Sequence, residues 1–188
     1  MPLYDEERMP HNFIAVLDEK YKTEGSDLEY YKSCDICGQA SSEIFSVADT
    51  EVPGVTHLTT EMTALNTGWY IVDSQLDFGG TRLQINGDVK ITLLDGCGIT
   101  TSGGIHVGPN KRLTVCSESI DLSENNNMGY IKVTGAPEDC AGIGSNYCES
   151  PLYTQSHYSY FENYFGSDDN VSETIICGGN IDVRGGLK

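Results

Sequence analysis

Short runs of alternating apolar residues, separated by corners that often contain glycine, recur through the last two thirds of the chain. Each run is too short for an α-helix, and alternation with period two is typical of a β-strand. The corners are too short to hold helices, so the pattern predicts rounds of short strands stacked on one another, as in a parallel β-helix. The expected strands span residues 70–72, 83–85, 89–93, 105–107, 113–115, 131–133, 175–176 and 181–183.

Alternation within the strands predicts which side chains form the core. Val89, Ile91 and Leu93 are expected to point inward, and Lys90 and Thr92 outward, because successive side chains of a strand lie on opposite faces. Stacked rounds then align the inward residues into aliphatic ladders. The same parity places these further residues inside: Ile105, Val107, Leu113, Val115, Ile131, Val133, Ile181 and Val183. It places these outside: Asp88, His106, Thr114, Cys116, Lys132, Asp182 and Arg184.

The repeats predict two domains. Residues 67–188 carry the strands, whereas residues 1–66 hold three of the 21 glycines and have weaker strand periodicity. The boundary is expected at the polar turn of residues 65–68, after a segment (59–65) that could form one or two helical turns. The expected fold class is all-β: a parallel β-helix preceded by a small N-terminal cap or zinc-ribbon-like element.

Charge limits the classes of partner. The net charge is −17 and the sequence pI is near 4.3, so binding of nucleic acid through phosphate neutralisation is not expected. No run approaches the ~18 apolar residues of a membrane-spanning helix, so membrane insertion is not expected either. The acidic N-terminus lacks the apolar region of a signal peptide, which fits a cytosolic protein or a fragment of a longer chain.

The ordered set of motifs resembles a repeat module of bacterial cell-surface proteins found in gut and rumen Firmicutes. Such modules look like carbohydrate-binding-domain-type right-handed β-helices. The resemblance implies an extracellular or cell-surface binding or adhesion module without catalysis, whose partner is a glycan or a surface protein. The motifs that carry it are Trp69–Val72, Val89–Thr100, Gly103–Val107, Leu113–Val115, Ala141–Gly144 and Ile176–Val183.

Residues 11–51 resemble a smaller element of the same proteins, in which one His and three Cys look like a zinc-type set. Here His11, Cys34 and Cys37 match, and the Cys-x-x-Cys-Gly turn is suited to aim two thiolates at one metal. The Cys expected between Tyr21 and Tyr30 is missing. Asp27 or Glu29 could supply a fourth ligand; alternatively the element is metal-free or carries a thiol pair.

One long interruption, residues 145–173, breaks the repeats and is rich in aromatic residues. Long insertions in compact repeats often carry function, and aromatic rings with polar tips suit sugars and protein partners. The alternative is that several rings pack the loop against the strands. The candidate ligand-binding residues are Tyr153, His157, Tyr158, Tyr160 and Tyr164.

Calcium and catalysis have weaker support in the sequence. Acidic residues gather at 168–170 and at several corners, but no calcium-loop motif occurs, so a solvated acidic face is the better interpretation. Polysaccharide lyases and hydrolases also use β-helices, yet no paired carboxylates, nucleophile elbow or phosphate loop can be recognised. A polysaccharide-active enzyme and a structural spacer remain as alternatives to a binding module.

Overall fold

The computed structural model describes residues 11–119, 127–138, 140–145 and 172–186. The chain divides into two compact units between Val55 and Thr56. This division precedes the boundary expected at residues 65–68. Two strands of two or three residues, too short to give a visible alternation, already belong to the sheets of the second unit.

The first unit is a three-stranded antiparallel sheet in the order β1 (Phe13–Ile14), β2 (Glu29–Cys34) and β3 (Ala40–Ser46). A short 3-10 helix, η2 (Glu19–Tyr21), lies between β1 and β2. The apolar residues that support the sheet alternate with exposed ones, so one face of the sheet covers a core that belongs to this unit. The buried apolar side chains are Tyr21, Leu28, Tyr30, Cys34, Phe45, Val47 and Val52.

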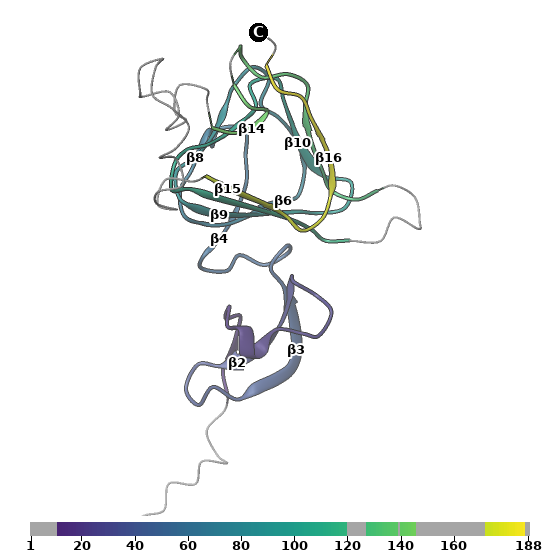
Figure 1. Cartoon of the computed structure of the whole chain (residues 1–188). Helices are drawn as coiled ribbons and strands as arrows, with labels where there is room; N and C mark the ends of the chain where they lie inside the picture. Colours follow the sequence, from purple (N-terminus) through teal and green to yellow (C-terminus); the bar gives the residue numbers. More distant parts are fainter. Residues whose placement is uncertain (1–10, 120–126, 139, 146–171, 187–188) are drawn as a thin grey trace, which may run out of the picture. The chain divides into compact units, whose positions relative to one another are not determined.

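The second unit consists of three parallel sheets, and no α-helix occurs among the described residues (Figure 1). The five-stranded sheet contains β4 (Val55–His57), β6 (Gly68–Val72), β9 (Asp88–Leu93), β12 (Arg112–Ser117) and β15 (Glu173–Ile176). One four-stranded sheet contains β7 (Gln75–Asp77), β10 (Gly98–Thr101), β13 (Tyr130–Val133) and β16 (Asn180–Val183). The other contains β5 (Ala64–Leu65), β8 (Leu83–Ile85), β11 (Ile105–Val107) and β14 (Ile143–Gly144).

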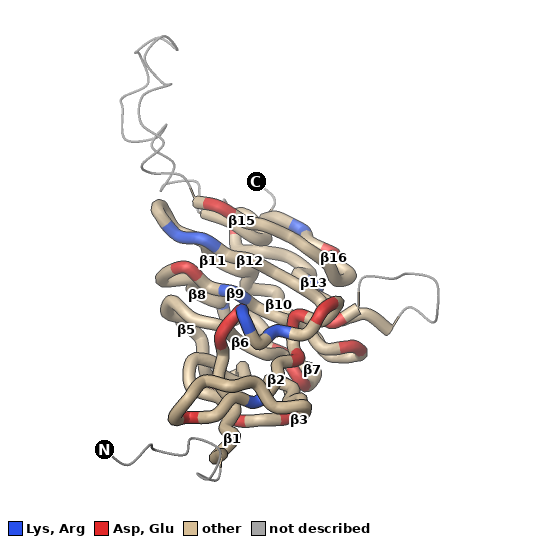
Figure 2. Tube along the Cα trace, turned by 90° about the horizontal axis from the view of Figure 1, so that it is seen from below, with Lys and Arg blue, Asp and Glu red and all other residues tan. Residues whose placement is uncertain are grey.

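From β6 onward the chain visits the three sheets in one repeating order. Each passage through all three is called a round below. Strands of successive rounds pair in register, so Tyr70, Ile91, Val115 and Ile176 stand in one row of the five-stranded sheet. Figure 2 shows the same succession of β6, β9, β12 and β15. Every expected strand is present, although the structure extends several and adds others such as β7 and β10.

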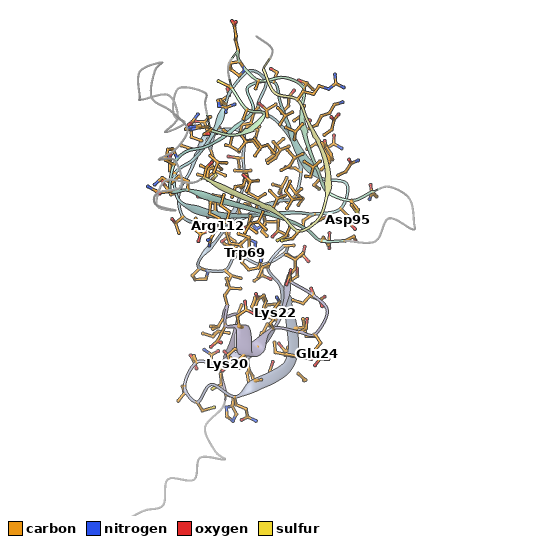
Figure 3. All side chains as sticks on the ribbon, viewed as in Figure 1. Lys20, Lys22, Glu24, Trp69, Asp95 and Arg112 are labelled. Carbon is orange, nitrogen blue, oxygen red and sulfur yellow. The ribbon has the colours of Figure 1, made fainter. Side chains whose placement is uncertain are left out.

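The predicted core is confirmed in the inner rounds. The side chains expected to point inward in β9, β11, β12 and β13 are all 0% exposed and join one apolar cluster that fills the space among the sheets (Figure 3). In the last round, however, Val183 is 38% exposed, because no later round covers it among the described residues.

Two residues expected to be outside are buried. Thr92 is 1% exposed because the indole Nε1 of Trp69, on the neighbouring strand, donates a hydrogen bond to its Oγ1 at 2.9 Å. Cys116 stands beside Thr92 in the same outward row and is 8% exposed. Outward parity on this sheet therefore does not guarantee exposure.

The segment before the boundary, for which the sequence allowed one or two helical turns, forms a turn that is not helical. The N–H of Met62 donates to the carbonyl of Thr59, and the chain then enters β5. Leu58 belongs to the apolar cluster and Met62 packs against it, so this segment supplies apolar cover for the core. No helix among the described residues has the length and apolar character needed to cross a bilayer.

Candidate metal centre

Three metal-ligating side chains converge in the first unit. His11 precedes β1, Cys34 is the last residue of β2, and Cys37 lies in the turn that leads to β3. Their potential ligand atoms all lie within 4.8 Å of one another, and the His11 Nδ1 is 3.4 Å from the Cys37 Sγ. The three residues that the sequence singled out as metal ligands are therefore brought together by the fold.

The Cys-x-x-Cys-Gly turn is held by backbone hydrogen bonds. The N–H of Gly38 donates to the Cys34 carbonyl at 2.9 Å, and the N–H of Cys34 donates to the Gln39 carbonyl at 2.9 Å. Gly38 has a φ of +70°, a conformation that side chains with a Cβ rarely adopt. The Tyr21 hydroxyl also donates to the Gly38 carbonyl, which ties the turn to the core of the unit.

A ring stack and two hydrogen bonds place His11 beside this turn. Phe13 pairs with Cys34 across β1 and β2, and its ring stacks on the His11 ring with centroids 5.6 Å apart. Asn12 donates its Nδ2 to the Asp35 carboxylate at 2.8 Å, and the Asp35 N–H donates to the Asn12 carbonyl at 3.1 Å. Sequence reasoning missed Asn12 and Asp35, whose only signal is that each is adjacent to a candidate ligand.

Hydrogen bonds to the Cys34 sulfur favour its thiolate form. The backbone N–H of Cys37, the His11 side chain and the backbone N–H of Ile36 lower the pKa of the Cys34 thiol from an ordinary 9.0 to about 6. Cys34 is buried, whereas His11 and Cys37 are exposed. Because the thiolate is the form that binds a metal, one ligand is already deprotonated near neutral pH.

This shift predicts a pH dependence in the metal-free protein. The pKa of Cys34 is lower in the folded protein than in the unfolded chain, so ionisation of this thiol stabilises the folded state. This contribution is complete above pH ~9 and is lost as the pH falls through about 6. Thiolate ultraviolet absorbance, measured against Cys34→Ser, should titrate near 6. A midpoint close to the ordinary value of 9.0 would contradict the hydrogen bonding described here.

The two carboxylates considered as a fourth ligand lie elsewhere. Glu29 begins β2 and Cys34 ends it, which places them ~16 Å apart at the usual rise of a strand. Asp27 forms an ion pair with Lys22, near the Glu29 end of the same strand. Within the described ranges the group therefore has three His, Cys or acidic ligands, and a fourth position is open to water or another donor.

The other sequence candidates do not form a comparable site in the described part of the chain. Tyr153, His157, Tyr158, Tyr160 and Tyr164 lie outside the described residues, as does the acidic run 168–170. The corner aspartates are engaged separately: Asp73 with His57, Asp77 with the N–H of Gly79, Asp88 with Arg112 and Asp95 with Ser119. None of them belongs to a cluster of potential metal ligands among the described residues.

Comparison of the chain with protein-family models, with curated proteins and with solved structures found no match.

Proposed function

We propose that the chain is a non-catalytic binding module, in which a zinc-holding N-terminal element precedes a right-handed parallel β-helix. The observation that carries the metal part of the proposal is the convergence of one imidazole and two thiols within 4.8 Å. Imidazole and thiolate ligands suit Zn²⁺, whereas Ca²⁺ and Mg²⁺ need oxygen ligands and iron–sulfur clusters commonly need four Cys.

The fixed order in which the chain visits the three sheets supports the β-helix. Each inner strand pairs in parallel with its equivalents one round before and after, for example β9 with β6 and β12. Connections between parallel strands of one sheet are right-handed in nearly all known cases, which favours the right-handed form. A stack of this kind is a rigid scaffold, and its specificity resides in outward side chains and insertions.

A binding role, with a glycan or a surface protein as partner, rests on the resemblance to bacterial surface modules. The extracellular or cell-surface location rests on the same resemblance. Strong negative charge disfavours polyanionic partners and is compatible with neutral sugars. The proposed contact residues are those of the aromatic interruption: Tyr153, His157, Tyr158, Tyr160 and Tyr164.

Metal analysis tests the zinc site. The purified chain, prepared with zinc at neutral pH, is expected to retain about one Zn²⁺ per molecule after dialysis. The double variant Cys34→Ser/Cys37→Ser removes two of the three ligands. Its affinity for zinc should fall by more than the ~10–100-fold that changes outside the ligand shell cause.

The matched control is Cys140→Ser, which removes a thiol that lies in the second unit and outside the metal group. It should retain zinc like the unaltered chain. A folded wild-type protein that binds no zinc under these conditions would contradict the site, whatever the outcome of the binding assays.

A glycan array tests the binding role. Tyr158→Ala/Tyr160→Ala/Tyr164→Ala is expected to abolish binding of the glycans that the unaltered chain retains, because the rings supply the apolar contact with the sugar. Tyr31→Ala, which changes an exposed tyrosine of the first unit, serves as control. Unchanged binding by the folded triple variant would exclude the interruption as the site, and release of shortened glycans would instead favour a polysaccharide-active enzyme.

A further inference from the structure

Two cysteines far apart in the sequence stand side by side on the five-stranded sheet. Strands β12 and β15 pair in parallel, with Val115 beside Ile176. The next residues are Cys116 and Cys177, and the Cys177 N–H donates to the Val115 carbonyl at 2.7 Å. This hydrogen bond continues the parallel register by one residue, so Cys177 lies beside Cys116.

Both side chains belong to the same face of the sheet. Val115 belongs to the apolar cluster, and Ile176 stands beside it with the same inward parity. Side chains alternate along a strand, so the residue after each points outward. Cys116 is 8% exposed and Cys177 is exposed. One thiol is therefore open to reagents, and its neighbour is protected.

The spacing is compatible with a disulfide. Neighbouring strands lie ~4.8 Å apart, which falls within the ~4.4–6.8 Å range of Cα separations across disulfides. A small movement would bring the two Cβ atoms closer. Gly178 and Gly179 follow Cys177 directly, and Gly179 has a φ of +97°, so the backbone on this side has freedom to adjust.

We infer that Cys116 and Cys177 form a dithiol site that external disulfides of low molecular mass, such as glutathione disulfide, convert to an intramolecular disulfide. The exposed Cys177 loses its proton and attacks the external disulfide, which forms a mixed disulfide and releases one thiol. Cys116, once deprotonated, attacks the Cys177 sulfur and expels the second thiol. Two protein thiols are oxidised and one external disulfide is reduced to two thiols.

The new disulfide would link the last round covalently to the one before it. Strand β15 is at the edge of its sheet, and its residues Ile175 and Ile176 are 38% and 50% exposed. A disulfide here closes a loop of ~60 residues, and long loops give the larger stabilisation in the chain-entropy model. Oxidation is expected to raise the midpoint of thermal unfolding of the second unit by ~10 °C.

The test is peptide mapping of the whole chain, loaded with zinc, after incubation with glutathione disulfide and without reduction. Cleavage after Lys, Arg and Glu isolates Cys116 in Leu113–Glu118 and Cys177 in Thr174–Arg184, each as the sole cysteine of its peptide. The expected result is one cross-linked species that joins these two peptides, and a thermal midpoint that dithiothreitol returns to its starting value.

Variants separate this pair from the other thiols. Cys116→Ser should leave Cys177 as a stable mixed disulfide with glutathione, and Cys140→Ser should leave the cross-link intact. A mixed disulfide that persists in the unaltered chain, a link from Cys177 to any other cysteine, or no reaction at either thiol would overturn the inference. A Cys34–Cys37 link would appear in different peptides and would concern the metal centre only.

Discussion

Replacing Ile91 by aspartate is expected to unfold the second unit. Ile91 is 0% exposed, and its register neighbours are Tyr70 and Val115. The substitution removes apolar contacts worth about 2–5 kcal/mol and places a carboxylate where no partner can pair with it. Since a domain has about 5–15 kcal/mol of total stability, the combined loss should abolish the cooperative transition in urea or on heating.

Thr114→Asp is the matched control, because it introduces the same carboxylate on the adjacent strand but on the outward face. Thr114 is partly exposed and stands beside Lys90, whose charge is opposite. Circular dichroism of this variant should show a transition close to that of the unaltered chain. If Ile91→Asp also retained such a transition, the row would not be a closed core.

Replacing Arg82 by methionine should cause the second large loss of stability. The Arg82 Nη1 donates to the carbonyls of Gly103 and Ala141 at 3.0 and 2.9 Å, and its Nη2 donates to that of Gly144 at 3.2 Å. The guanidinium thus joins its own round to the two that follow. Methionine keeps much of the apolar stem but leaves three carbonyls without this donor. Since hydrogen bonds to charged groups contribute about 1.5–3 kcal/mol each and are not additive, we expect a loss of ~3 kcal/mol in the free energy of unfolding.

Arg112→Met provides the comparison at the surface. Arg112 contacts the carboxylates of Asp88 and Glu173, and its side chain is 51% exposed. Glu173 is the main reason that the pKa of Arg112 is raised, with Asp88 adding to the effect. Exposed pairs of this kind stabilise little because water screens them, so urea midpoints should be nearly unchanged. Equal effects of the two arginine substitutions would contradict the role assigned to Arg82.

Much of the strand pattern could be predicted from residues that are near one another in the sequence. Alternation identified the inward residues of β9 and β12, and the structure buries them completely. The exceptions are instructive: Thr92 is covered by Trp69, which comes from the preceding round. Val183 has inward parity but lacks a covering round among the described residues. Burial of a side chain depends on the next round as well as on its own strand.

The same distinction between local pattern and long-range contact applies to His11, Cys34 and Cys37. The Cys-x-x-Cys-Gly turn marks Cys34 and Cys37 as neighbours by local geometry alone. The proximity of His11 depends on the pairing of Phe13 with Cys34 and on the contact between Asn12 and Asp35, which no local pattern indicates. Conversely, the strand between Glu29 and Cys34 separates a carboxylate that the sequence left as a possible ligand.

The sequence by itself determined the all-β character, the short alternating strands and most of the core, because the period of a strand is a local property of consecutive residues. Only the tertiary structure decided which distant residues share a place. Arg82 donates to the Ala141 carbonyl, Cys116 lies beside Cys177, and His11 contacts Cys37. In the second unit these contacts follow from the register of paired strands, which is fixed when the rounds stack over a common core. In the first unit, the antiparallel pairing of β1 with β2 brings His11 to the turn that holds Cys37.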